Sequence, residues 1–367
     1  MAMRRFFTSA VAMAAVVAAI PVGRLPEKRD LVTTITLTAA STYTATIAPA
    51  TPIVPTGTAT FSGTPVPYPD ESGSSKTSKN GTSSGSCGSG GCEPGGSGGS
   101  GSSGLPGISY APYRADHQCK TEDEISHDLS RLANDYSVLR IYGTECDQVA
   151  NLHSCAKSHG MKLFLGIWSI DDVQTEAQRI IDGIDGDWDM VDTISVGNEL
   201  VNNKAASPAQ VIAAVKQARA IFRGAGYQGP VVTVDTFMAA NANPELCNES
   251  DYCAVNAHAF FDAHTSAEEA GQWLSNTVEE LRSKVSGNKR IVVCETGWPT
   301  QGNTNGKAVP GITQQKAALE SIRDAFADHP ENLILFSAFD DLWKKAEAST
   351  FMAEQHWGID GRKSASD

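Results

Sequence analysis

Short apolar runs alternate with longer amphipathic segments along the chain from residue 105 onward. The short runs are rich in β-branched residues, as buried strands are, whereas the longer segments repeat their apolar residues at helical spacing. Helices are expected between the strands, and only the segment after the fifth strand lacks a clear one. We expect eight strands, at residues 107–111, 138–142, 162–168, a run ending at 199, 231–236, 252–261, 291–296 and 333–339.

Helix start signals support this alternation. Thr121–Glu124 has the form of a capping box, and the apolar residues Ile125 and Leu129 then follow on one helix face. Ser207 stands directly before Pro208, an N-cap residue followed by proline at the first helical position. Further helices are expected over residues 146–160, 173–184, 266–285 and 313–327.

Eight strands with intervening helices over about 255 residues match the usual size of a (β/α)8 TIM barrel, an α/β fold. An open doubly wound sheet is the alternative architecture. That sheet would need a glycine-rich phosphate loop after the first strand, and Tyr110-Ala111-Pro112-Tyr113 is not such a loop. We therefore expect a barrel domain over residues 105–361, followed by a polar tail over residues 362–367.

The residues ahead of the barrel have the composition of an exported protein. A basic start followed by a short apolar run predicts a signal peptide over residues 1–20. Lys28-Arg29 is a candidate dibasic processing site, which would define a propeptide over residues 21–29, although a chance basic pair is the alternative. Residues 30–71 are rich in Thr and Pro and are expected to form an O-glycosylated stalk. Residues 72–104 are rich in Gly and Ser, as flexible linkers are.

Export changes how other features are interpreted. Asn80 and Asn248 begin glycosylation sequons, which are either used or silent. No segment beyond the first 20 residues is long and apolar enough to suggest a transmembrane helix, and the polar tail lacks the apolar end of a lipid-anchor signal. The sequence therefore predicts a secreted, cell-wall protein, which we expect to be a monomer.

The net charge of −13 argues against nucleic acid as a partner and favours a neutral or cationic ligand. The eight cysteines are expected to be structural, because exported proteins keep disulfides. We expect three pairs from their positions: Cys247 with Cys253 across a short loop, Cys119 with Cys146 between neighbouring barrel loops, and Cys87 with Cys92 in the linker.

Two cysteines have no evident partner. Cys155 lies in a predicted helix, and Cys294 directly precedes Glu295, so regular strand alternation would turn its side chain away from the barrel axis. No histidine motif suggests a nucleophilic cysteine. The chain has no CxxC or HxxxH spacing either, so we expect neither a metal site nor a cofactor.

Two glutamates stand where the chemistry of such a barrel is placed. Glu199 ends the predicted fourth strand and Glu295 lies at the end of the seventh, each beside a Gly- or Asn-bearing turn. Carboxylates at the C-terminal ends of parallel strands point into the barrel mouth. Two facing carboxylates about 5–5.5 Å apart cleave glycosidic bonds with retention of configuration.

Five short motifs follow one another along the same segment: Gly107–Tyr110, Arg140–Cys146, Ser195–Glu199, Cys294–Pro299 and His356–Ile359. In this order and spacing, the segment resembles glycoside hydrolase family 17, the β-1,3-glucanases, in particular its fungal cell-wall members. The resemblance covers roughly residues 105–361. It implies that Glu199 is the proton donor and Glu295 the nucleophile of a retaining mechanism.

Several neighbours of the glutamates are candidate substrate contacts. Asn198 is placed to hydrogen-bond the sugar 2-hydroxyl. The Tyr142 hydroxyl could reach Glu295, or the ring could be core. His258, where plant members of the family carry Tyr, is either a substrate contact or a buried histidine. Trp298 offers a flat face for a glucose ring or packs in the core.

The segment after the eighth strand supplies two further candidates, Trp343 and Lys344, which could line the same cleft. Here the sequence departs from the pattern of fungal relatives, because Ser337, Asp341 and Leu342 stand where those relatives often carry Glu, Glu and Pro. Both glutamates of the chemical step are intact. The departure leaves the linkage preference and the number of sugar subsites open.

The leading hypothesis is a retaining hydrolase of β-1,3-glucan. A β-1,3-glucanosyltransferase would use the same covalent glycosyl-enzyme and resolve it with a sugar hydroxyl instead of water. An exo-acting β-glucosidase would need a cleft blocked at one end. A glucan-binding wall protein without catalysis is the alternative outside enzymes, and the presence of both glutamates argues against it.

Overall fold

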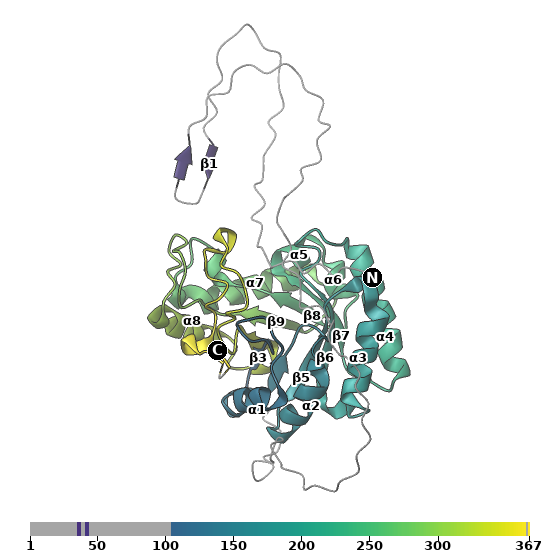
Figure 1. Cartoon of the computed structure of the whole chain (residues 1–367). Coiled ribbons are helices and arrows are strands. Elements are labelled where there is room, and N and C mark those ends of the chain that lie inside the picture. Colours follow the sequence, from purple (N-terminus) through teal and green to yellow (C-terminus); the bar gives the residue numbers. More distant parts are fainter. Residues whose placement is uncertain (1–34, 38–40, 44–103, 365) are drawn as a thin grey trace, which may run out of the picture. The chain divides into compact units, whose positions relative to one another are not determined.

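The computed structural model describes residues 35–37, 41–43, 104–364 and 366–367 (Figure 1). The expected signal peptide, the propeptide and residues 72–103 of the linker, together with Asn80 and the Cys87–Cys92 pair, lie outside the described residues. Within the expected stalk, β1 (Ile35–Leu37) pairs antiparallel with β2 (Ser41–Tyr43). This pair belongs to one compact unit and the barrel to another. Among the described helices, none has the length and apolarity that a membrane span requires.

The described barrel is a closed ring of parallel strands in chain order, which confirms the (β/α)8 prediction (Figure 1). Pairing of the last strand with the first closes the ring. The strands are β3 (Gly107–Ser109), β4 (Val138–Arg140), β5 (Lys162–Ile167), β6 (Val191–Asn198), β7 (Val231–Thr236), β8 (Cys253–Asn256), β9 (Ile291–Thr296) and β10 (Leu333–Leu335).

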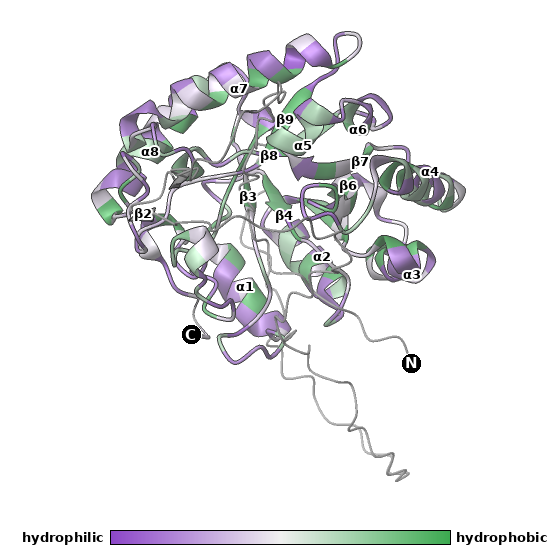
Figure 2. Ribbon diagram, turned by 90° about the horizontal axis from the view of Figure 1, so that it is seen from above, coloured by the Kyte–Doolittle hydropathy of each residue, from purple (hydrophilic) through white to green (hydrophobic). Residues whose placement is uncertain are grey.

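The α-helices ring the strands when the barrel is viewed from above (Figure 2). They are α1 (Glu122–Ser130), α2 (Gln148–Ser158), α3 (Val173–Ile184), α4 (Pro208–Gly224), α5 (Phe237–Ala242), α6 (Glu245–Asn248), α7 (Ala270–Lys284) and α8 (Ile312–Ala325). Short 3-10 helices lie at Ile170–Asp172, Trp188–Met190, Ala259–Phe261, Ala267–Glu269, Pro330–Asn332, Ala348–Thr350 and Ile359–Gly361.

Both predicted helix starts are confirmed. Thr121 caps α1 in a reciprocal capping box with Glu124, and Ile125 is buried. Ser207 caps α4 in the same way with Gln210, ahead of Pro208. These boxes satisfy backbone N–H groups that the first helical turn leaves without intrahelical partners.

The segment after the fifth barrel strand differs from the prediction, because it holds two short helices, α5 and α6. Thr236 caps α5 by accepting a hydrogen bond from the amide of Ala239. Neither helix is long enough to show a helical repeat of apolar residues, and Pro244 stands between them. The strands β8 and β10 are also shorter than predicted. The chain turns into a 3-10 helix at Ala259–Phe261, soon after β8 ends.

Two apolar layers flank the strands. Alternate residues of neighbouring strands fill the barrel interior, for example Phe164, Val232, Val292 and Ile334. Cys294 belongs to this interior cluster, so the expectation that it faces the helices is wrong. The reason is an irregularity in β9: Val255 pairs with Val293, but Asn256 pairs with Glu295, so the ladder skips Cys294 and resets the alternation.

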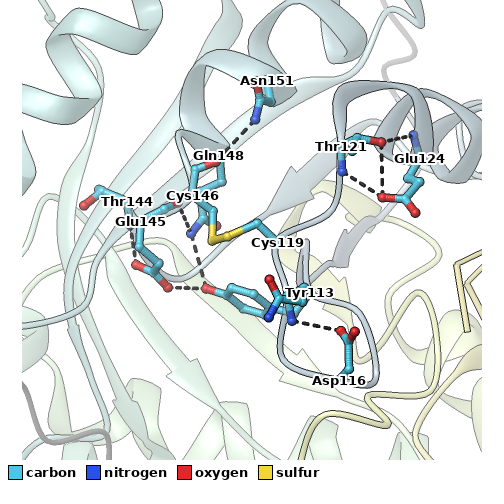
Figure 3. The surroundings of a disulfide bond; sticks show 11 residues. Tyr113, Asp116, Cys119, Thr121, Glu124, Thr144, Glu145, Cys146, Gln148 and Asn151 are labelled. Atoms are coloured by element: carbon cyan, nitrogen blue, oxygen red, sulfur yellow. Dashed lines mark hydrogen bonds between the residues drawn. A yellow bond between two sulfur atoms is a disulfide. The ribbon is translucent and has the colours of Figure 1, made fainter. Parts of the chain in front are cut away.

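The disulfide Cys119–Cys146 is formed as predicted (Figure 3). So is the predicted disulfide Cys247–Cys253. Cys155 is disulfide-bonded as well. Cys294 is a free cysteine, and burial raises the pKa of its thiol to about 12. A thiol with that pKa is a poor nucleophile, in agreement with a structural role.

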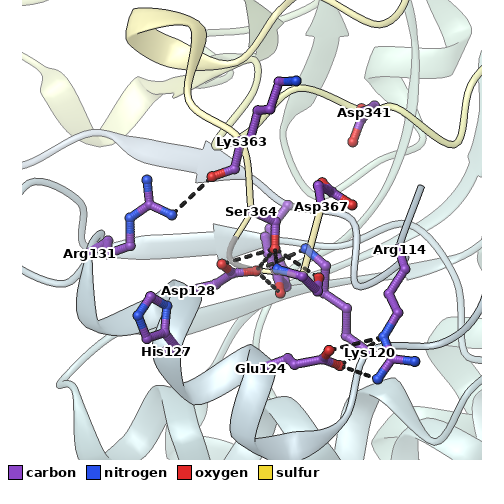
Figure 4. Close-up of polar contacts among 12 residues, drawn as sticks. Arg114, Lys120, Glu124, His127, Asp128, Arg131, Asp341, Lys363, Ser364 and Asp367 are labelled. Atoms are coloured by element: carbon purple, nitrogen blue, oxygen red, sulfur yellow. Dashed lines mark hydrogen bonds and ion pairs between the residues drawn. The ribbon is translucent and has the colours of Figure 1, made fainter.

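The C-terminal residues pack against the barrel instead of forming a separate tail (Figure 4). The buried Ser364 hydroxyl donates a hydrogen bond to Asp128, whose carboxylate also pairs with Lys120 at 2.8 Å. Arg131 donates to the carbonyl of Lys363 at 3.0 Å. The described part of residues 362–367 is therefore continuous with the barrel domain.

Candidate active site

Glu199 directly follows β6 and is buried, with 3% of its surface exposed. Its backbone is left-handed, with φ of 54°, and its amide donates to the carbonyl of Val234 on β7 at 2.9 Å. Its side-chain Oε1 accepts a hydrogen bond from Asn256 Nδ2, also at 2.9 Å. The end of β6 thus turns sharply and leaves the Glu199 carboxyl beside the end of β8.

Glu295 lies in β9 and is also buried, with 7% of its surface exposed. Its Oε1 accepts from Arg140 Nη1 at 2.9 Å, and its Oε2 lies 3.3 Å from His258 Nε2. Burial alone would raise the pKa of this carboxyl. The Arg140 charge and the His258 hydrogen bond outweigh burial and lower the pKa of Glu295 to about 2.

Arg140 and Asn256 join the two glutamates into one polar network. Arg140 Nη2 donates to Asn198 Oδ1 at 2.9 Å, and Arg140 Nη1 lies 3.4 Å from Asn256 Oδ1. Asn256 Nδ2 donates both to Asn198 Oδ1 and to Glu199. Arg140 thus holds Glu295 in β9 and Asn256 holds Glu199 after β6, and the contact between Arg140 and Asn256 links the two carboxyl groups.

Tyr142 lies beside this network. Its ring covers the Arg140 guanidinium at 4.5 Å, a cation–π contact. Its hydroxyl is buried near Glu295 but makes no hydrogen bond of standard geometry within the described residues, so the predicted bond to Glu295 stays a prediction. Burial and the charge of Glu295 raise the pKa of the Tyr142 hydroxyl well above its usual value.

His258 meets Glu295 at one nitrogen, and aromatic rings surround its imidazole. The ring centroid of Trp357 lies 4.9 Å away and that of Phe336 5.5 Å away, both edge to face. Only 11% of the His258 side chain is exposed. The structure therefore brings His258 to the site as a largely buried partner of Glu295.

Lys344 and Trp343 lie in the segment after β10. Lys344 Nζ pairs with Asp341 at 3.1 Å, and the neighbouring acidic groups raise the pKa of Lys344 although burial opposes this. The Trp343 indole also donates to Asp341, and its ring meets Tyr113 edge to face at 5.1 Å. Tyr113 in turn donates to Glu145 (Figure 3). The segments after β3, β4 and β10 therefore contact one another.

Trp298 does not reach the site, and this prediction is corrected. The side chain is fully buried, its indole N–H donates to the carbonyl of Val309 at 2.9 Å, and its ring packs on Phe260. A ring with 0% exposure offers no face to a sugar. Trp298 is a core residue beneath the segment that follows β9.

Asn248, the described residue of the two predicted glycosylation sites, ends α6 and is half-buried. Its Oδ1 accepts from the amide of Ser286 at 2.8 Å. The sequon residue Ser250 is buried and donates to the carbonyl of Leu246. Use of this sequon remains a prediction.

Sequence reasoning gave no role to Arg140 or Asn256, although both lie in the runs on which it relied. Each is the last residue of an apolar strand, β4 or β8, and that position could have identified them. No group of three potential metal ligands occurs within the described ranges. The site is thus built from two carboxyl groups, one guanidinium, two amides and one imidazole.

Comparison with known proteins agrees with this arrangement. The probable family 17 glucosidase SCW4 of Saccharomyces cerevisiae is 43% identical over 255 residues, which cover 69% of this chain and 64% of that protein. The cell surface mannoprotein MP65 of Candida albicans is 41% identical, over 69% of this chain and 66% of that protein. The chain thus spans just under two thirds of the length of these relatives.

Among solved structures, the glycoside hydrolase family 17 β-1,3-glucanosyltransferase of Rhizomucor miehei shares the fold. Its TM-score is 0.61 at 23% identity, over 72% of this chain and 97% of that one. The family likeness expected from the motifs is confirmed by the names of the relatives. Residues 107–358 match the BtgE/BtgC glycoside hydrolase domain, and the chain therefore belongs to that family.

Proposed function

We propose that the protein is a secreted, wall-associated retaining glycosidase that hydrolyses β-1,3-glucan, with Glu295 as nucleophile and Glu199 as proton donor. The observation that carries the proposal is the polar network that joins the two carboxyl groups at the barrel mouth. Arg140 keeps Glu295 ionised, and Asn256, which lies against Arg140, donates to Glu199. A retaining mechanism needs two carboxyl groups at one site, one of them an ionised nucleophile.

In the first step, an ionised Glu295 oxygen bonds to the anomeric carbon while the bond to the leaving oxygen breaks. Glu199 gives its proton to that oxygen. In the second step, Glu199 takes a proton from water, and the water oxygen displaces Glu295 from the sugar. The proposed mechanism places the transferred proton on Glu199, because Arg140 keeps Glu295 ionised.

The relatives support the substrate class and the location. One is named a family 17 glucosidase and another a cell surface mannoprotein, and Emericella nidulans has a 33% identical relative named a probable β-glucosidase. The signal peptide predicted over residues 1–20 agrees with export. Asn198, His258 and Lys344 lie in or beside the network and remain proposed substrate contacts.

Transfer to a sugar hydroxyl is a second candidate function. The R. miehei protein that shares the fold is named a glucanosyltransferase, and both reactions pass through the same glycosyl-enzyme. The segments after β3, β4 and β10 that meet at Tyr113 and Trp343 add aromatic surface near the mouth, and aromatic acceptor subsites favour transfer. The second step then ends with a new glycosidic bond in place of a reducing end.

Incubation with β-1,3-gluco-oligosaccharides of defined length tests the proposal. Exclusively shorter products indicate hydrolysis, longer products indicate transfer, and glucose released from one end indicates exo action. Glu199→Gln and Glu295→Gln should each lower the rate on the order of 10³-fold or more. Near-full activity of Glu295→Gln would refute the assignment, and binding of laminarin without cleavage by the wild type would favour a glucan-binding role.

A further inference from the structure

Asp235 is a buried carboxylate near the end of β7 that takes no part in the network described above. It has 2% of its surface exposed, and no basic side chain pairs with it within the described part of the chain. Its carboxylate instead accepts from three backbone amides, those of Val201 and Thr236 at 2.8 Å and that of Asn202 at 3.2 Å. Burying a charged group without a cation costs free energy, so the presence of a carboxylate at this position needs an explanation.

Two of these amides belong to the turn that leaves Glu199. The amide of Asn203 donates back to the carbonyl of Glu199, and those of Ala205 and Ala206 donate to the carbonyl of Leu200, so the turn is compact. Thr236, next to Asp235, donates its hydroxyl to Asn202 Oδ1 at 3.1 Å. The end of β7 therefore holds the turn both through a carboxylate and through a hydroxyl.

The turn begins with unusual backbone conformations. Gly197 has φ of 78° and Glu199 has φ of 54°, a left-handed region that glutamate seldom adopts. The positive φ favours glycine at position 197, and a Cβ there would also lie 2.6 Å from Leu200 Cδ1, the movable end of that side chain. Strained residues persist only where surrounding contacts fix them. Those contacts are the bond from the Glu199 amide to Val234 and the carboxylate of Asp235.

We propose that Asp235 is the positioning residue for Glu199, and that its carboxylate fixes the turn that aims this proton donor at the leaving oxygen. The inference rests on the proposed function, because the role of Glu199 as donor does. Asp235 acts through the backbone and touches neither substrate nor the Glu199 carboxyl in the described contacts.

The chemistry of the site favours a carboxylate over its neutral isostere. Both Asp235 oxygens accept from N–H groups, so the amide of an asparagine would turn N–H donors toward other donors. Burial raises the pKa of Asp235 to about 6, while the three backbone hydrogen bonds oppose that rise. The three backbone hydrogen bonds therefore offset part of the cost of burying the ionised Asp235 carboxylate.

The test compares Asp235→Asn with wild type on two substrates. Laminarin needs a proton on its leaving oxygen, whereas a 2,4-dinitrophenyl β-glycoside of laminaribiose does not. We expect kcat/KM on laminarin to fall about 10²-fold, the usual contribution of a positioned acid. We expect kcat/KM on the aryl glycoside to fall less than about tenfold, because kcat/KM reports the first step and this leaving group departs without a proton. Equal losses on both substrates, or an unchanged laminarin rate, would overturn the inference.

Asp251→Asn is the matched control. Asp251 Oδ2 accepts from the amide of Val231 at 2.7 Å, at the opposite end of the same strand. Unlike Asp235, it is exposed and pairs with Arg219, so the variant removes a carboxylate that holds β7 far from the mouth. The Asp251→Asn variant should have the same ratio of kcat/KM on laminarin to kcat/KM on the aryl glycoside as the wild type. A selective loss in Asp251→Asn equal to that in Asp235→Asn would also count against the inference.

Amide hydrogen exchange separates this inference from the proposed function. In Asp235→Asn, the amides of Val201 and Asn202 should exchange at least about tenfold faster than in wild type, and in Asp251→Asn they should not. If the wild type cleaves neither substrate, the proposed function fails and the exchange rates alone decide whether Asp235 holds the turn. Unchanged protection in Asp235→Asn would overturn it.

Discussion

Arg140 determines the charge of Glu295. Their ion pair is 2.9 Å long, and the pKa of Glu295 is lowered to about 2. Because the folded-state pKa lies below the usual value near 4.3, the pair stabilises the fold above that pH and this stability is lost as pH falls toward 2. Glu295, the proposed nucleophile, should therefore stay ionised throughout the mildly acidic range.

The pH profile of kcat/KM tests this statement. In wild type, we expect no loss of activity from Glu295 titration above about pH 3. In Arg140→Met the burial of Glu295 acts without its counter-charge, so the acidic limb should move upward by about two pH units or more. An acidic limb that does not move would contradict the role of Arg140. Arg323→Met is the control, since that guanidinium covers Tyr136 much as Arg140 covers Tyr142.

The sequence predicts charged groups at strand ends better than it predicts their surroundings. Glu199 and Glu295 stand out because each is a carboxyl beside a turn at the end of an apolar strand. Arg140, Asn256 and Asp235 are polar residues at or next to the end of an apolar strand, so a search for any polar residue at that position would have found them. Whether a side chain is exposed to solvent cannot be recognised from its neighbours in the sequence. Trp298 is buried because residues distant in the chain, such as Phe260, cover it.

At the scale of elements, strands and helices with strong periodicity were predicted, and irregular pieces were not. The helices α5 and α6 were not predicted, because their six and four residues are too few to show a helical repeat of apolar positions. The interior position of Cys294 was not predicted because it results from the pairing of β8 with β9, in which Cys294 has no partner residue. Register irregularities of this kind arise from pairing, which one strand cannot reveal.

The two described disulfides should differ in what they contribute. Cys119 and Cys146 are 27 residues apart, and Cys247 and Cys253 only 6. In the chain-entropy treatment, the longer loop stabilises the fold by about 3.5 kcal/mol and the shorter by about 2 kcal/mol. Replacing each pair with serines and measuring denaturant unfolding checks this order.

The two double-serine variants should also differ in their KM for laminarin. Cys119–Cys146 joins the segments after β3 and β4, where Tyr113 contacts Glu145 (Figure 3). Its loss should raise KM for laminarin several-fold at little cost in kcat, because the glutamate network does not include these residues. Removal of Cys247–Cys253 is the internal control and should leave KM unchanged. A larger stability loss from the shorter loop would contradict the prediction.

At the scale of the whole molecule, the charge of −13 affects which glucans the protein could approach under the proposed function. A neutral polysaccharide feels no net attraction or repulsion, so its encounter with the protein should not depend on salt. A carboxymethylated glucan carries negative charge and should be repelled. Salt weakens that repulsion, because the screening length falls from about 30 Å at 0.01 M to about 3 Å at 1 M ionic strength.

We therefore expect kcat/KM on laminarin to change less than about twofold between 0.01 M and 0.5 M salt. On carboxymethyl β-1,3-glucan it should begin lower and rise several-fold over the same range. Comparing the two substrates in one salt series removes effects of salt on the enzyme itself. A steep fall of the laminarin rate with salt would mean that charge attraction drives binding, which a neutral glucan cannot supply, and would therefore speak against a neutral glucan as the substrate.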